Sequence, residues 1–210
     1  MESLSNKPNQ KEGANSLQAD LEALKNTDKE IYESIQKDLQ EADQVWEKAQ
    51  GSLKGLENKE VHVLKSMMKP PQDVLGVLCA CMHLMAGVVP ESCIDVDEKK
   101  NPTDLTWKGC WRMLGDWRFF RDQMLGMKKL VDEGKVADEK IENVRSYLKM
   151  EWFDVESVKV RSLPASQFCE AVRKIVCYFD IVKEIRVKIK IALGKSGEGS
   201  QGNGLQERED

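Results

Sequence analysis

Three side chains of types that bind transition metals, Cys79, Cys81 and His83, stand close together in the sequence. Zinc sites commonly take ligands from such a pair and from a second pair further along the chain. On a helix, residues four apart share a face, so Cys79 and His83 could point the same way while Cys81 could not. No second pair follows with finger-like spacing. Core packing is therefore the better interpretation, and no metal site is predicted.

Gly194-Lys195-Ser196 has the order found at the end of a nucleotide-binding phosphate loop. Such a loop needs a further glycine where this chain has Ile189, and it follows a β-strand, which the sequence does not predict here. Pairs such as Glu139-Lys140 are interpreted as solvated helix faces. His62 has no matching acid or nucleophile signature in the sequence. The sequence therefore predicts no catalytic residues, no cofactor and no enzyme.

Charge is distributed unevenly along the 210 residues, whose formal net charge is −4. Residues 1–60 carry 8 Lys/Arg against 13 Asp/Glu, whereas residues 61–193 carry 22 against 19. The net-basic part points to an acidic partner surface. No signal peptide or transmembrane stretch is expected, and the six cysteines lack the spacing of a disulfide framework. We expect a soluble cytoplasmic protein with free thiols, and no nucleic-acid or membrane partner.

A heptad pattern begins at Leu17 and follows residues 1–15, which are polar and predicted to be disordered. A pattern sustained over this length predicts a coiled-coil stalk helix over residues 16–69. Leu39 and Leu53 lie one place off the stripe. Its positions are Leu17, Leu21, Leu24, Asp28, Ile31, Ile35, Asp38, Ala42, Val45, Ala49, Ser52, Leu56, Lys59 and Val63.

Pro70 and Pro71 end this pattern, because a proline pair removes two backbone donors and disfavours helix in the preceding residue. Further helices are predicted over 72–86, 107–114, 116–127 and 138–149, with a long loop over 88–106. Asp154 is expected to cap a short turn and Ser162 to cap the last long helix. The aromatic residues of 107–120, Trp111 included, are assigned to the core. No strand pattern of useful length appears, so the fold class is all-α.

Several segments, taken together and in order, resemble the stalk and microtubule-binding domain of dynein heavy chains. They are EVHVLKSMMKPPQDV, VLGVLCACMHLMAG, WKGCWRMLGDWRFF and FDVESVKVRSLPASQFCEAVRKIVCYFDIV. The third segment and the long loop before it look axonemal. The resemblance implies an antiparallel coiled-coil stalk capped by a small helical head over residues 70–168, with a returning stalk helix over 169–193 and a disordered tail over 194–210. Val187 stands where the family usually has a proline, so no kink is expected there.

The same resemblance implies a non-catalytic module that binds microtubules through a basic face of the head, in the cytoskeleton and in the axoneme of a cilium. No ATPase ring is encoded in this chain, although a full-length relative would be an ATP-driven motor. Pro70 and Pro71 are the candidate hinge. The candidate contacts with tubulin are Lys65, Lys69, Lys149, Lys159 and Arg161.

The predicted helices differ in length. An outgoing helix of about 48 residues would extend roughly 70 Å, whereas the returning helix has only about 30 residues. The N-terminal half of the heptad would then fray, fold back or pair with another chain. The alternative function is accordingly a coiled-coil interaction protein, derived from a dynein stalk, that binds a partner chain through residues 17–56 and has little affinity for tubulin.

Overall fold

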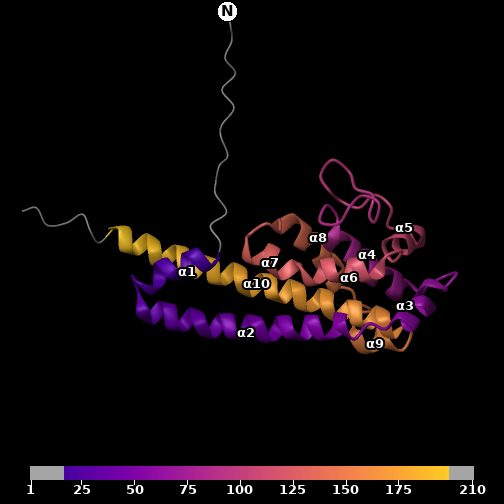
Figure 1. Cartoon of the computed structure of the whole chain (residues 1–210), viewed down its shortest axis with the longest axis horizontal. Coiled ribbons are helices and arrows are strands. Elements are labelled where there is room, and N and C mark those ends of the chain that lie inside the picture. Colours follow the sequence, from indigo (N-terminus) through magenta and orange to yellow (C-terminus); the bar gives the residue numbers. More distant parts are fainter. Residues whose placement is uncertain (1–16, 199–210) are drawn as a thin grey trace, which may run out of the picture.

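Two long antiparallel helices form the frame of the molecule, and most of the shorter helices pack along one side of them (Figure 1). The structure is a computed structural model that describes residues 17–198, with side chains described as far as Gly194. The helices are α1 (Leu17–Lys25), α2 (Lys29–Lys54), α3 (Asn58–Lys65), α4 (Gln72–Met85), α5 (Trp107–Met113), α6 (Trp117–Leu125), α7 (Met127–Asp132), α8 (Asp138–Leu148), α9 (Val155–Lys159) and α10 (Leu163–Glu198). The described residues form no strand, only an isolated bridge between Val96 and Pro102, so the all-α prediction is confirmed.

The helices α2 and α10 run side by side over most of the length of α2. Lys188 bonds Asp38 at 2.8 Å, and the rings of Trp46 and Tyr178 lie 5.4 Å apart. The pairing is therefore antiparallel. The buried residues of α2 are Ile35, Ala42, Trp46, Ala49 and Leu53.

The buried stripe on α2 differs from the predicted heptad at every second position. Trp46 and Leu53 are buried where the heptad was assigned to Val45 and Ser52, which are only partly covered. The larger apolar side chains stand one place further along the chain, and burying them removes more apolar area from water. Leu39 and Leu53, which lie one place off the predicted stripe, thus belong to the observed interface of α2.

The single outgoing helix expected over 16–69 is interrupted twice, which corrects that prediction. Asn26 and Thr27 bond the carbonyls of Glu22 and Ala23, and the carboxylate of Asp28 accepts from the backbone N–H of Ile31. These bonds end α1 and begin α2, as expected of polar residues at helix termini. The second interruption follows α2, at residues 55–57.

The helix α1 turns back and packs on both α2 and α10. Leu24 is fully buried and Leu17 nearly so. The expectation that the N-terminal half of the heptad lacks a partner within the chain is therefore wrong for α1 and α2. Of the three outcomes foreseen for that segment, the described structure shows folding back.

Most of the head agrees with the sequence prediction. The helix predicted over 72–86 is α4, which ends before Gly87, and Gly87 adopts a positive φ of 73° that suits glycine. The helices predicted over 107–114, 116–127 and 138–149 correspond to α5, α6 and α8. The helix α7, which was not predicted, follows α6 directly. Buried side chains of α4 and α10, with Phe120 and Phe168 in ring contact at 6.3 Å, form the core.

The last helix begins as predicted, with the hydroxyl of Ser162 accepting from the backbone N–H of Ala165. The carboxylate of Asp154 accepts from the N–H of Ser157 and begins α9. The helix α10 passes Val187 without a break and continues to Glu198, beyond the boundary expected at residue 193. The disorder predicted for residues 1–15, and for most of the tail, lies outside the described residues.

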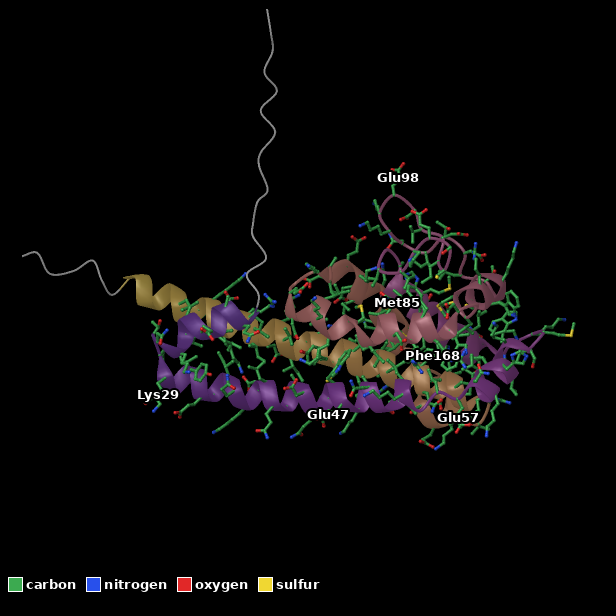
Figure 2. All side chains as sticks on the ribbon, viewed as in Figure 1. Lys29, Glu47, Glu57, Met85, Glu98 and Phe168 are labelled. Carbon is green, nitrogen blue, oxygen red and sulfur yellow. The ribbon has the colours of Figure 1, made fainter. Side chains whose placement is uncertain are left out.

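Arg112 holds the loop over residues 88–106 against α5. Its guanidinium lies 2.6 Å from Asp95 and 3.3 Å from Asp104. Figure 2 shows Glu98 at the outer edge of this loop, away from Met85 in the head. The loop is thus fastened at its base and projects from the body of the head.

We expect Gly109→Ala to destabilise the fold. A Cβ at this buried position would lie 2.0 Å from the backbone carbonyl oxygen of Asp104, which cannot swing away as a side chain could. Overpacking of this kind costs about 1–3 kcal/mol, and here the cost should lie at the upper end. Urea unfolding followed by circular dichroism measures it, with Gly51→Ala as the control because nothing lies within 4 Å of a Cβ there. Equal midpoints for the two variants would contradict the prediction.

Candidate binding surface at the tip

The end of the molecule opposite α1 is built from two chain reversals. One is the link from α3 to α4, residues 66–71, and the other is the link from α9 to α10, residues 160–162. Both lie at the same end of the long axis, which we call the tip (Figure 1). In Figure 2, Glu57 lies toward this end and Lys29 at the opposite one. The two reversals bring segments about 100 residues apart in sequence to one end of the protein.

Lys65 and Lys69 belong to the first reversal. Lys65 is the last residue of α3, and its ammonium lies 5.1 Å from the centre of the Trp111 ring. Lys69 is exposed in the link. Pro71 is the N-cap of α4 with a ψ of 156°, so the prolines do separate α3 from α4 as their chemistry requires. Movement about Pro70 and Pro71 stays a prediction.

Lys159 and Arg161 belong to the second reversal. Both are exposed, and Lys159 makes a loose ion pair of 3.7 Å with Glu156 one turn earlier on α9. Exposed pairs at this distance contribute little, so the charge of Lys159 is available to a partner. The helix α9 is positioned by Val158, which is fully buried.

Lys149 stands apart from these four residues. It is the exposed C-cap of α8, a different segment of the head. The structure therefore brings Lys65 and Lys69 to the same end as Lys159 and Arg161, and Lys149 comes from a separate element. Its part in binding stays a prediction.

Exposed apolar side chains accompany the cations at the tip, and sequence reasoning did not identify them. Met68 is 93% exposed and Val160 is 83% exposed. Trp111, which was assigned to the core, is 51% exposed because α5 turns this face outward, which corrects that prediction. Exposed apolar side chains with polar residues around them are typical of protein-binding surfaces. The only sequence signal was that these residues stand outside the apolar periodicity.

Two further cations lie near the same end. Lys108 on α5 and Arg118 on α6 are exposed, and the guanidinium of Arg118 lies 5.2 Å from the centre of the Trp117 ring. A groove of about 220 Å³ separates α3 from the turn before α6 and has both Lys65 and Arg118 in its lining. The tip therefore carries exposed cations beside carboxylates such as Asp116 and Glu156, and the groove is too small to enclose a substrate.

The metal-like residues of α4 have ordinary structural surroundings. The thiols of Cys79 and Cys81 are buried, and the Cys79 thiol lies 3.3 Å from the carbonyl oxygen of Leu105. Burial, and secondarily the charge of Lys140, lowers the pKa of His83. Within residues 17–198, no three His, Cys, Asp or Glu side chains are grouped so as to hold a metal ion. No helix of this same region is long and apolar enough to cross a membrane.

These observations define a class of protein. A pair of long antiparallel helices carries a helical head, and two links with exposed cations and exposed apolar side chains lie at one end. This is a helical stalk protein with a candidate binding surface at its tip. The coiled-coil geometry of the pair and the boundaries of the domains stay predictions.

The family follows from comparison with known proteins. A model of the microtubule-binding stalk of the dynein motor matches residues 6–200, nearly the whole chain. The chain therefore belongs to the dynein microtubule-binding stalk family, and the resemblance found in the sequence is confirmed. The matched domain is the stalk, not the ATPase region of the motor.

The relatives are dynein chains, and most of them are named as flagellar, ciliary or axonemal. A dynein alpha chain of the flagellar outer arm of Chlamydomonas reinhardtii is 28% identical over 155 residues, which is 74% of this chain. A ciliary dynein beta chain of Tripneustes gratilla is 27% identical over 77% of this chain, and axonemal dynein heavy chain 2 of Homo sapiens is 26% identical over 79%. The chain spans about 3% of the length of each of these relatives.

Proposed function

We propose that this chain is a non-catalytic tip module that binds tubulin in microtubules through the cationic and apolar surface at its tip. The observation that carries the proposal is that the end of α3, with Lys65 and Lys69, and the end of α9, with Lys159 and Arg161, lie at the same end of a family member whose domain is named for microtubule binding. The proposed setting is the cytoskeleton of a cilium or flagellum, because the relatives are named for these structures. No ATP-driven step is assigned to this chain.

Charge and shape both support this function. Attraction to an acidic lattice needs several cations on one surface, and the four tip cations come from two reversals that the head holds in place. Met68 and Val160 add apolar area that would be buried in a complex. The cations would speed association and fix orientation, while the apolar contacts would slow dissociation.

The alternative function, a coiled-coil interaction protein acting through residues 17–56, is less well supported. The largest apolar side chains of α1 and α2, including Leu24, Ile35 and Leu53, are already buried within the chain. A second coiled-coil chain would have to displace α1 or α10 to reach them. A partner chain on this segment nevertheless stays an alternative outcome of the test below.

Co-sedimentation with stabilised microtubules tests the proposal. We expect saturable binding that weakens as salt rises, because the screening length falls to about 8 Å at physiological ionic strength. The ratio of bound chain to tubulin gives the stoichiometry, and an excess of the unlabelled chain should displace a labelled one. Absence of saturable binding at low salt would overturn the proposal and favour the partner-chain alternative, which size-exclusion chromatography with light scattering would then examine.

A further inference from the structure

A polar cluster joins three helices at the middle of the stalk. The ammonium of Lys128 on α7 lies 3.2 Å from Asp43 on α2 and 3.3 Å from Asp132, and it donates to the hydroxyl of Tyr178 on α10 at 2.9 Å. The hydroxyl of Tyr178 in turn donates to Asp132. We call these four residues the Lys128 cluster. Every polar group in it has a partner, which makes its geometry specific.

The surroundings of the cluster make it more than a surface ion pair. Tyr178 is 1% exposed, and its ring packs against Trp46 of α2 at 5.4 Å. Burial, and then the hydrogen bond to Asp132, raise the pKa of Tyr178. Burial opposes the charge of Lys128, yet its bond to Tyr178 and the nearby carboxylates raise its pKa above the ordinary value. Lys128 therefore remains charged and Tyr178 remains a neutral donor at physiological pH.

The returning helix is fastened to the head at several points. Arg145 pairs with Asp180, Lys183 lies 2.7 Å from Asp138, and Arg186 donates to the carbonyl of Asp132 at 2.6 Å. Each of these contacts joins α10 to α7, α8 or the residues that begin and end them. The helix α10 and the head therefore form one unit, against which α2 is placed.

Only part of the apolar seam of α2 distinguishes one placement from another, because Trp46 and Leu53 belong to the observed stripe alone and the other buried residues fit both stripes. Ile35, Ala42 and Ala49 belong both to the observed stripe of α2 and to the predicted heptad with Asp38, Val45 and Ser52. Two of these three shared residues are alanines, whose small side chains discriminate weakly between registers. In coiled coils, a polar side chain in the seam commonly fixes the register instead.

We propose that the Lys128 cluster is the device that fixes the register of α2 against α10 and the head. Asp43 is the contribution of the outgoing helix to the cluster. A shift of α2 by half a heptad would carry Asp43 about 5 Å along the helix axis and break its contact with Lys128.

Cysteine crosslinking without microtubules tests the proposal. Asp38→Cys is combined with Lys188→Cys, which reports the observed register, or with Glu184→Cys or Ile191→Cys, which lie about one turn away along α10 on the same face. Cys177→Ser removes the exposed native thiol from all the proteins. Oxidation is followed by intact mass and peptide mapping, and the rates for the three pairs are compared.

In the otherwise unchanged chain, we expect the pair at 38 and 188 to crosslink at least about tenfold faster than the other two. Lys128→Met with Tyr178→Phe should reduce this preference at least about fivefold, because the cluster is lost while side-chain volume is nearly kept. Asp43→Asn, at a position where the side chain is 62% exposed and folding is not at risk, should change the preference in the same direction. Lys129→Met is the matched control, since Lys129 is 81% exposed and pairs with Glu133 on its own side of the molecule.

An unchanged preference in both the Asp43→Asn and the Lys128→Met with Tyr178→Phe proteins would overturn the proposal. A preference reduced equally by Lys129→Met would also overturn it, since that result would reflect general loss of charge on α7. Because the readout needs no tubulin, failure of the register proposal is distinguished from failure of microtubule binding, which co-sedimentation measures separately.

Discussion

Lys159→Glu combined with Arg161→Glu is expected to weaken microtubule binding by at least about tenfold at low salt, equivalent to about 1.4 kcal/mol or more. Both side chains are exposed at the tip, so reversal replaces attraction to an acidic lattice with repulsion and disturbs little within the fold. Among the described residues, the change removes the loose ion pair between Lys159 and Glu156. Co-sedimentation across a range of tubulin concentrations gives the dissociation constant.

The matched control reverses the same number of charges at the other end of the molecule. Lys25 at the end of α1 and Lys190 near the end of α10 are both exposed, and Lys25→Glu with Lys190→Glu gives the same net charge as the tip variant. We expect this protein to bind nearly as the wild type does, and the difference between the two variants should shrink as salt rises. Equal binding by the wild type and the tip variant would remove this face from the binding site.

The sequence predicted most of the head because local signals there agree with the tertiary structure. The proline pair, Gly87, Asp154 and Ser162 each act through backbone chemistry that does not depend on distant residues. The structure of the N-terminal half was harder to predict. Whether α1 continues the line of α2 or turns back depends on three short polar residues, Asn26, Thr27 and Asp28, whose capping bonds compete with an otherwise continuous heptad.

The choice of stripe on α2 exposes a second limit of sequence reasoning. Counting heptad steps cannot separate two overlapping stripes, because both contain Ile35 and Ala42. What decides between them is the partner surface, which here includes the aromatic ring of Tyr178 against Trp46. That contact joins residues more than 100 positions apart and leaves no signal in either local pattern.

The candidate site was predicted in part. Basic residues near the reversals could be chosen from the resemblance to dynein stalks, and four of the five occupy one end of the structure. The apolar members could not be chosen this way, because an exposed tryptophan and a buried one look alike in sequence. Trp111 and Trp117 lie six residues apart, yet only Trp117 is buried, with its indole N–H donating to Asn58.

This contrast gives the second large prediction, for Trp111→Ala. Tryptophan at the centre of an interface commonly contributes 2 kcal/mol or more, so we expect microtubule affinity to fall by about 30-fold. The free energy of unfolding should change by less than about 1 kcal/mol, because the ring is half exposed and its contact with Lys65 is an exposed cation–π interaction. Co-sedimentation measures the first quantity and urea unfolding the second.

Trp117→Ala provides the comparison that makes the result interpretable. Trp117 is 7% exposed, so its removal should lower the free energy of unfolding by about 3–5 kcal/mol. A Trp111→Ala protein that binds microtubules normally would show that the tip acts through its charges alone. A Trp111→Ala protein as unstable as Trp117→Ala would instead show that Trp111 is a core residue. Loss of binding with stability retained is the combination that places Trp111 in the interface, because a residue needed only for folding cannot produce it.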